Sequence, residues 1–374
     1  MIEKLAIAVA IGHFYSEKLA DSSLWKTNHE LIEMPHKQKG ILMVRNPISA
    51  TIDFSKDGIQ HGFLRVPHSS NDSAWGAIMI PITQFKNGDG DTALITGGNH
   101  GDEYEGPIAL YNFARRNKVS DITGRVIIVP AMNYPAFQAA TRVSPIDNCN
   151  MNRIYPGKPK GTVSHLIADF FSTTLLPLAD FVLDIHSGGK TLNFLPFAAY
   201  HQLQDKDQER RCKEAMQAFA APYQVKMLEI DADGMYDTQV ESMGKIFVTT
   251  ELGGAGTTTP SSIAIAKRGI DNFLIHAGVL KGDLKSPETP PIKLDMQDSS
   301  CYLFSEHSGL IEPCVNLGDK VNEGDLMAQI HITERTSVTP YKYYAPRTGL
   351  VISRHIPSLV KMGDCLNVIA EVIN

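Results

Sequence analysis

Apolar runs that fit strands alternate with stretches that fit helices through the middle of the chain. Four runs have the length of buried strands: 92–98, 124–133, 180–186 and 245–252. Three stretches between or after them fit helices: 106–117, 164–176 and 260–281. This alternation is typical of an α/β domain with a mixed, mainly parallel sheet flanked by helices. We expect that domain to occupy residues 46–285.

The two ends of the chain are patterned differently from the middle. Residues 1–45 are weakly patterned, and we interpret them as an N-terminal appendage. Short β-like runs fill 48–82. The stretch 283–295 carries three prolines and is typical of a linker. It separates the α/β domain from a C-terminal domain, for which we expect residues 286–374.

That C-terminal domain contains a weak internal repeat. Its two halves, 309–330 and 349–370, each contain Gly-Leu, then a valine, then Gly-Asp and a leucine. Two hairpin-rich halves indicate an all-β domain, a barrel or a sandwich. The tail resembles the biotinyl/lipoyl-type fold, but 331–339 lacks the lysine that such carriers modify. We therefore expect a structural cap rather than a carrier.

Composition and charge exclude several classes of protein. The formal net charge of −6 argues against nucleic acid as the main partner. Five cysteines without a CxxC pair favour a reduced, cytoplasmic setting over a disulfide framework. The N-terminus lacks the features of a signal peptide, and no segment approaches the ~18 apolar residues that span a bilayer. We expect neither a nucleic acid nor a membrane as partner.

Three side chains suited to zinc follow or end two of the predicted strands. His100 and Glu103 come directly after the strand at 92–98, and His186 ends the strand at 180–186. Open α/β sheets bind ligands at the carboxyl ends of their strands, and catalytic zinc usually takes three protein ligands. Asp184 shares a strand face with His186 and could orient its imidazole. The alternative is a polar loop and a buried histidine bonded to backbone.

A zinc hydrolase also needs a base, and Glu251 ends the strand at 245–252. Near a metal it could take a proton from water and pass it to a leaving nitrogen. The alternative is a loop or helix-cap glutamate. The turn-rich segment 141–157 adds Arg142, Asn152 and Arg153, which could bind carboxylates or an oxyanion, or simply form a surface loop.

Taken together, four motifs resemble the succinylglutamate desuccinylase/aspartoacylase family, whose members are relatives of the zinc carboxypeptidases. The motifs are HGDE, NMNRIYPG, DIHSGG and TTELGG. The resemblance implies one zinc ion per chain on His100, Glu103 and His186, with Glu251 as the base. It implies that Asn152 and Arg153 bind a carboxylate and that Arg142 polarises the scissile carbonyl. Asn150 stands where several relatives have aspartate, so one zinc histidine lacks a carboxylate partner.

Within that family, residues 50–82 and the stretch through 254 resemble enzymes that remove acetate from N-α-acetyl-L-2,4-diaminobutyrate in ectoine breakdown. The resemblance implies a small N-acyl amino acid as substrate, and we expect a cytoplasmic homo-oligomer. Another substrate, such as N-acetyl-aspartate or N-succinyl-glutamate, is the alternative, and a catalytically silent binding protein is a third. No residue is singled out for the second amine of diaminobutyrate; Asp102, Glu105 and Asp147 are candidates, each equally a solvated or capping acid.

Overall fold

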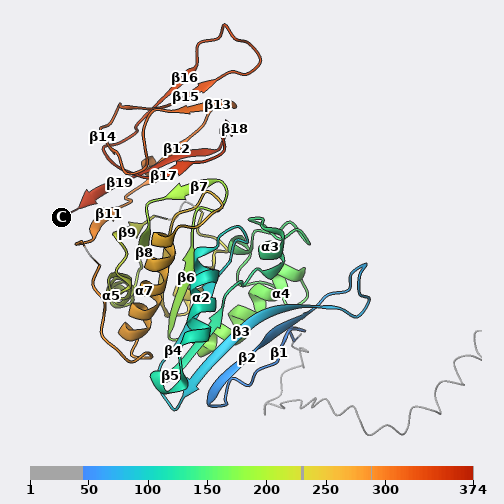
Figure 1. Cartoon of the computed structure of the whole chain (residues 1–374). Coiled ribbons are helices and arrows are strands. Elements are labelled where there is room, and N and C mark those ends of the chain that lie inside the picture. Colours follow the sequence, from blue (N-terminus) through green and yellow to red (C-terminus); the bar gives the residue numbers. More distant parts are fainter. Residues whose placement is uncertain (1–44, 229–230, 288, 374) are drawn as a thin grey trace, which may run out of the picture. The chain divides into compact units, whose positions relative to one another are not determined.

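The computed structural model describes residues 45–228, 231–287 and 289–373, so the predicted N-terminal appendage lies outside the described residues except for Arg45. A mixed sheet runs through the α/β part (Figure 1), with strand order β1-β2-β3-β5-β4-β6-β10-β8-β9-β11. Its strands are β1 (Ser49–Ala50), β2 (Gly58–Pro67), β3 (Ala77–Asn87), β4 (Thr92–Gly97), β5 (Gly124–Val129), β6 (Phe181–His186), β8 (Phe197–His201), β9 (Tyr223–Met227), β10 (Ile246–Glu251) and β11 (Ile292–Asp295).

The centre of this sheet is parallel. Strand β4 pairs in parallel with β5 and β6, and β6 pairs in parallel with β10. The outer strands β2 and β3 form an antiparallel hairpin, and β8 runs antiparallel to β10. Both faces of β4, β5 and β6 are buried, which explains their continuous apolar runs. The predicted mixed, mainly parallel sheet is confirmed.

Helices cover both faces of the sheet. The helices are α2 (Glu105–Arg116), α3 (Tyr134–Ala139), α4 (Val163–Phe170), α5 (Lys206–Phe219), α6 (Tyr236–Ser242) and α7 (Pro260–His276). One core joins α2, α5 and α7 to one face of the sheet, and a second joins α4 and α6 to the other. Strand residues alternate between them: Ile95 packs in the first core and Leu94 in the second.

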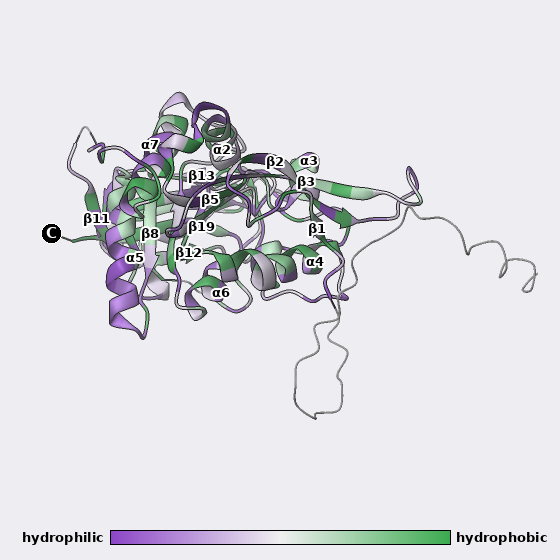
Figure 2. Cartoon of the chain, turned by 90° about the horizontal axis from the view of Figure 1, so that it is seen from below, coloured by the Kyte–Doolittle hydropathy of each residue, from purple (hydrophilic) through white to green (hydrophobic). Residues whose placement is uncertain are grey.

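The exposed surface of helix α5 is polar. Helix α5 is largely hydrophilic in Figure 2, and its buried residues are Cys212, Ala215, Met216 and Phe219. These four lie at helical spacing, so a single apolar stripe faces the sheet. Among the described residues, the structure shows no helix with the length and apolarity needed to cross a membrane.

The described residues after 295 form strands and one 3₁₀ turn, η5 (Ser299–Cys301), as predicted for an all-β tail. The strands are β12 (Tyr302–Phe304), β13 (Gly309–Pro313), β14 (Lys320–Val321), β15 (Leu326–His331), β16 (Tyr341–Tyr344), β17 (Gly349–His355), β18 (Leu359–Val360) and β19 (Cys365–Ile373). One four-stranded antiparallel sheet has the order β16-β15-β13-β18. The other strands extend from β11 in the order β19-β17-β14, with β12 beside β19.

The internal repeat has a structural counterpart. Each half contains a first strand, a short strand and a second long strand: β13, β14 and β15, then β17, β18 and β19. The short strand of each half pairs with the first strand of the other, β14 with β17 and β18 with β13. The two halves are therefore interlocked by backbone hydrogen bonds, which fits a structural rather than a mobile role.

The structure corrects two parts of the sequence interpretation. The last four residues of the predicted linker form β11, which pairs in parallel with β9. Helix α4 ends at Phe170, and a π turn and a 3₁₀ turn continue to Leu178. Strands β8 and β9 and helices α5 and α6 had no sequence prediction; they lie between the motifs, where the chain shows shorter apolar runs.

Candidate active site

His100, Glu103 and His186 meet at the carboxyl edge of the sheet, and all three are buried. Their candidate ligand atoms lie within 4.8 Å of one another. Nδ1 of His100 is 2.7 Å from one oxygen of Glu103, and Nδ1 of His186 is 2.9 Å from the other. The Glu103 carboxylate thus lies between two imidazoles that point at it through the same ring atom.

The Nε2 atoms of both histidines, which are not the atoms that contact Glu103, also have protein partners. Nε2 of His186 is 2.8 Å from Oδ2 of Asp184, the partner expected from its place on the strand. Thr96 and Asn99 also donate to the Asp184 carboxylate, which fixes its position. Nε2 of His100 lies 3.2 Å from the side-chain oxygen of Asn150. Nε2 of His100 therefore contacts an amide oxygen, whereas Nε2 of His186 contacts a carboxylate oxygen.

Burial and charge set the protonation of this cluster. Burial and the charge of Arg142 lower the pKa of His100 to about 4, so its ring is neutral. Burial alone would also lower the pKa of His186, but the negative charges of Asp184 and Glu103 raise it well above its usual value. The pKa of Glu103 is lowered by the two histidines although burial opposes the shift. The site thus favours a positive charge between Glu103 and Asp184.

These residues fit a zinc ion. Two imidazole nitrogens and a carboxylate oxygen are a common ligand set for catalytic zinc, and hydrogen bonds to the outer ring nitrogens are typical of metal-bound histidines. The negative charge that raises the pKa of His186 is the charge a divalent cation would neutralise. His100, Glu103 and His186 would hold the metal.

A pocket opens beside the cluster. It is lined by His100, Arg142, Asn152, Arg153, Asp184, His186, Met227, Met235, Asp237, Phe247, Thr249 and Glu251. Its cavity volume is about 100 Å³, which is smaller than the about 300–1,000 Å³ of sites for drug-sized ligands. The structure thus brings Glu251, Arg142, Asn152 and Arg153, the four residues predicted around the metal, into one pocket.

Two arginines line this pocket. Nη1 of Arg142 lies 3.6 Å from Oε1 of Glu103, at the metal cluster. Arg153 donates from Nη1 to the Asn152 carbonyl and from Nε to Asp231, an exposed acid. The side-chain oxygen of Asn152 accepts from the backbone N–H of Tyr236 at 2.9 Å, so its amide nitrogen is the group that can donate to a ligand.

The loops that follow β6 and β10 are tied together. The backbone N–H of Gly188 donates to the carbonyl of Gly253, and that of Ala255 to the carbonyl of Leu192. Strand β7 (Leu192–Phe194) extends this connection, because it pairs with β17 of the C-terminal region. A Cβ atom on Gly254 would clash with the Leu192 carbonyl oxygen, so this approach requires glycine.

The three acids considered for the second amine do not line the pocket. Asp102 accepts from the backbone N–H of Lys190, and Glu105 accepts from Ser262. Asp147 accepts from both the backbone and the hydroxyl of Ser164, at the start of α4. Asp102 and Glu105 are buried and Asp147 caps a helix, so all three have structural contacts. The acid that sequence analysis missed on the pocket wall is Asp237.

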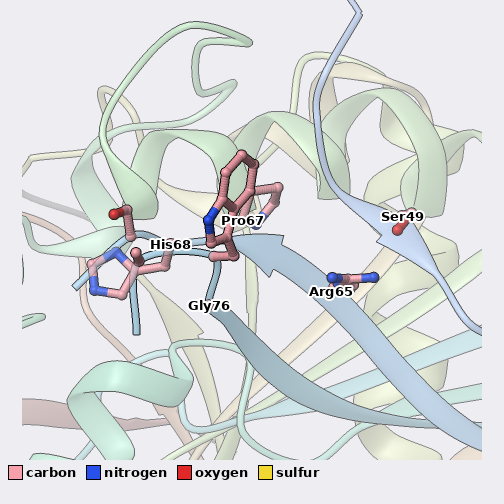
Figure 3. A pocket seen from close by; sticks show the side chains of 8 residues that line it. Ser49, Arg65, Pro67, His68 and Gly76 are labelled. Atoms are coloured by element: carbon pink, nitrogen blue, oxygen red, sulfur yellow. The ribbon is translucent and has the colours of Figure 1, made fainter. Parts of the chain in front are cut away.

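A larger hollow lies on the β2–β3 hairpin (Figure 3). Its lining includes Arg65, His68 and Trp75, and its cavity volume is about 500 Å³. The described residues that line it include no carboxylate and a single histidine, His68, so they do not form a set of three metal ligands. The buried cluster therefore marks the better candidate for an active site.

The fold and the pocket define the class: an α/β enzyme with a candidate metal centre at the carboxyl edge of its sheet, of the kind that hydrolyses amides. The chain belongs to the succinylglutamate desuccinylase/aspartoacylase family, because the catalytic-domain model of that family matches residues 89–277. The resemblance predicted from the motifs is confirmed, and with it the prediction of an amidohydrolase that acts on N-acyl amino acids.

Individual relatives cover almost the whole described chain. The N-alpha-acetyl-L-2,4-diaminobutyric acid deacetylase of Halomonas elongata is 55% identical over 328 residues, 88% of this chain and 96% of that protein. The product-bound structure of the ectoine utilization protein EutE (DoeB) from Ruegeria pomeroyi is 57% identical, with a TM-score of 0.85, and covers 87% of this chain and 99% of its own. A succinylglutamate desuccinylase/aspartoacylase structure from Rhodobacter sphaeroides is 38% identical, with a TM-score of 0.83 over 87% and 99% of the two chains.

Proposed function

We propose that this chain removes the acetyl group from N-α-acetyl-L-2,4-diaminobutyrate in a zinc-dependent hydrolysis that yields acetate and 2,4-diaminobutyrate. The observation that carries the proposal is the single pocket that joins a buried His-Glu-His cluster to Glu251 and two arginines. The 55% identity to the Halomonas elongata deacetylase supports this choice of substrate.

Zinc, when bound, supplies Lewis acidity for an amide carbonyl and for water. Glu251 takes a proton from the attacking water onto its carboxylate and delivers it to the α-nitrogen as the amide bond breaks. Arg142 donates to the carbonyl oxygen as negative charge develops there. Asn152 and Arg153 bind the α-carboxylate, which places the acetyl group toward the metal cluster.

A panel of substrates tests this proposal. The zinc-loaded chain is incubated with N-α-acetyl-L-2,4-diaminobutyrate, N-acetyl-aspartate and N-succinyl-glutamate, and release of acetate or succinate is measured. We expect the highest kcat/KM with the first. A higher kcat/KM with either of the others would favour the alternative substrate class, and a zinc-loaded chain that turns over none of them would favour a silent binding protein. A cytoplasmic location and a homo-oligomeric state stay predictions.

A further inference from the structure

The substrate pocket contains a carboxylate that the hydrolysis does not use. Asp237 lies in the first turn of α6, is only 6% exposed and lines the pocket. Its Oδ1 accepts from the backbone N–H and the hydroxyl of Thr238, which hold the side chain at the start of the helix. A carboxylate on the wall of a ligand pocket can form a charge-assisted hydrogen bond with a cationic group of the ligand.

The surroundings of Asp237 distinguish it from the other acids of the pocket. Asp184 is held by Thr96, Asn99 and His186 as the outer partner of the metal cluster. Glu251 ends β10 opposite His186, where the hydrolysis needs a base. Asp237 instead shares the pocket wall with Met227, Met235 and Phe247. Asp237 is therefore a carboxylate on the pocket wall that neither the metal cluster nor the proposed base accounts for.

The position of Asp237 is also fixed relative to the α-carboxylate subsite. Tyr236, the preceding residue, donates its backbone N–H to the side chain of Asn152. The first turn of α6 is thus hydrogen-bonded to a residue assigned to the α-carboxylate. A ligand whose carboxylate meets Asn152 and Arg153 therefore lies beside the first turn of α6. In diaminobutyrate, the side chain is a short chain ending in ammonium.

We propose that Asp237 binds the side-chain ammonium group of the substrate and so selects a short cationic side chain over anionic ones. The inference rests on the proposed function and names the residue that sets its specificity. It assigns the second amine to Asp237 in place of Asp102, Glu105 and Asp147, whose contacts are structural. An N-acyl aspartate or glutamate would instead bring a second carboxylate toward Asp237, which like-charge repulsion disfavours.

The competing explanation is that Asp237 only stabilises α6. An acid in the first turn of a helix interacts favourably with its amino end. A stabilising role predicts equal losses with every substrate, whereas a binding role predicts a loss confined to substrates that carry the amine. The two roles are therefore separated by comparing a substrate with its analogue that lacks only this amine.

The test uses the zinc-loaded full chain with Asp237→Asn, which keeps the oxygen that accepts from Thr238. The matched control is Asp233→Asn, which removes the same charge from an exposed residue of the loop that precedes α6. Acetate release is measured from N-α-acetyl-L-2,4-diaminobutyrate and from N-acetyl-L-2-aminobutyrate. We expect Asp237→Asn to lower kcat/KM by about 100-fold with the first substrate. With the second substrate, the fall in kcat/KM should be no more than about tenfold. Asp233→Asn should change neither.

Asp237→Glu, which keeps the charge, should keep the preference for the amine-bearing substrate; it also serves if Asp237→Asn does not fold. Equal losses with both substrates, or no loss with either, would overturn the assignment of Asp237 and leave the deacetylase function intact. Loss of the preference in Asp237→Glu together with an unchanged preference in Asp237→Asn would do the same. A wild-type chain that hydrolyses neither compound would contradict the deacetylase function, and this assignment with it.

Discussion

Glu251 lies directly opposite His186 in the parallel register of β10 and β6. Residues paired in this way share a face of the sheet, so the register itself brings the carboxylate of Glu251 to the same pocket as the metal cluster. The backbone hydrogen bonds of two central strands therefore set the position of the proposed base relative to His186. Sites built on strands are more precise than sites built on loops.

The first prediction concerns Glu251 itself. Glu251→Gln keeps the size of the side chain but removes its ability to accept a proton. We expect zinc content to stay at that of wild type and kcat to fall by about 10²–10⁴-fold, the usual effect of losing a general base. Steady-state acetate release and metal analysis measure the two. Glu323→Gln, at an exposed position of the C-terminal region, is the control, and a Glu251→Gln enzyme as active as this control would exclude the base.

The hydrogen bond from His186 to Asp184 should strengthen metal binding. Asp184→Asn replaces the carboxylate at 2.8 Å from Nε2 with a neutral amide, and we expect zinc affinity to fall by about 10–100-fold. Competition with a chromophoric chelator measures the affinity. The control is Asp180→Asn, because Asp180 accepts from the backbone of Thr92 at the other end of the strands. Equal zinc affinity in the two variants would show that Asp184 does not support the metal.

The loops that follow β6 and β10 approach each other closely at Gly254, so a larger side chain at this position should destabilise the fold. A methyl group there meets the Leu192 carbonyl oxygen and also sits on a backbone with a φ of +147°. We expect Gly254→Ala to lower the free energy of unfolding by about 3 kcal/mol and to lower activity. Gly244 has a φ of +71° but nothing within 4 Å of an added Cβ, so Gly244→Ala should cost only about 1 kcal/mol. Denaturant unfolding compares them, and equal costs would show that the Leu192 contact is not rigid.

Asp147 should matter for stability in a pH-dependent way. Burial acts to raise its pKa, but hydrogen bonds from Thr162 and Ser164 outweigh burial and lower the pKa below its usual value. A lowered pKa means that the stabilisation is complete above the unfolded-state value, about 3.9, and is lost as the pH falls through the folded-state value. We expect Asp147→Ala to cost about 1 kcal/mol at pH 7.

That cost should shrink as the pH falls below about 4. Urea unfolding at several pH values measures it, relative to the exposed Asp89→Ala as a control. A cost that stays constant down to pH 3 would mean that the charge of Asp147 contributes nothing to the cap. A specific loss of turnover with the amine-bearing substrate would instead place Asp147 at the substrate.

Sequence patterns located the residues that end or follow the central strands. His186 and Glu251 end apolar runs, His100 and Glu103 follow one, and parallel strands bring their carboxyl ends to one edge of the sheet. The contact of Asp184 with His186 could be predicted because residues two apart in a strand point to the same face of the sheet. Local patterns therefore sufficed wherever regular strand geometry fixes a side chain.

Asp237 was out of reach of the same reasoning. It lies on α6, a helix of seven residues with neither a strand end nor a metal-type motif beside it. Its place on the pocket depends on packing between α6 and the central sheet, through contacts such as that of Tyr236 with Phe247. One hydrogen-bond partner of the Asn152 side chain is likewise a backbone N–H 84 residues away in the chain. Such long-range contacts leave no periodic signal in the sequence.

The most direct test of a zinc-dependent deacetylase is the recovery of activity as zinc is returned to a chelated chain. Acetate release from N-α-acetyl-L-2,4-diaminobutyrate is measured while zinc is titrated into the metal-free chain. We predict that activity is absent without zinc, rises linearly and reaches its plateau at one zinc ion per chain. Full acetate release by the metal-free chain, or none from this substrate at one zinc ion per chain, would contradict the account.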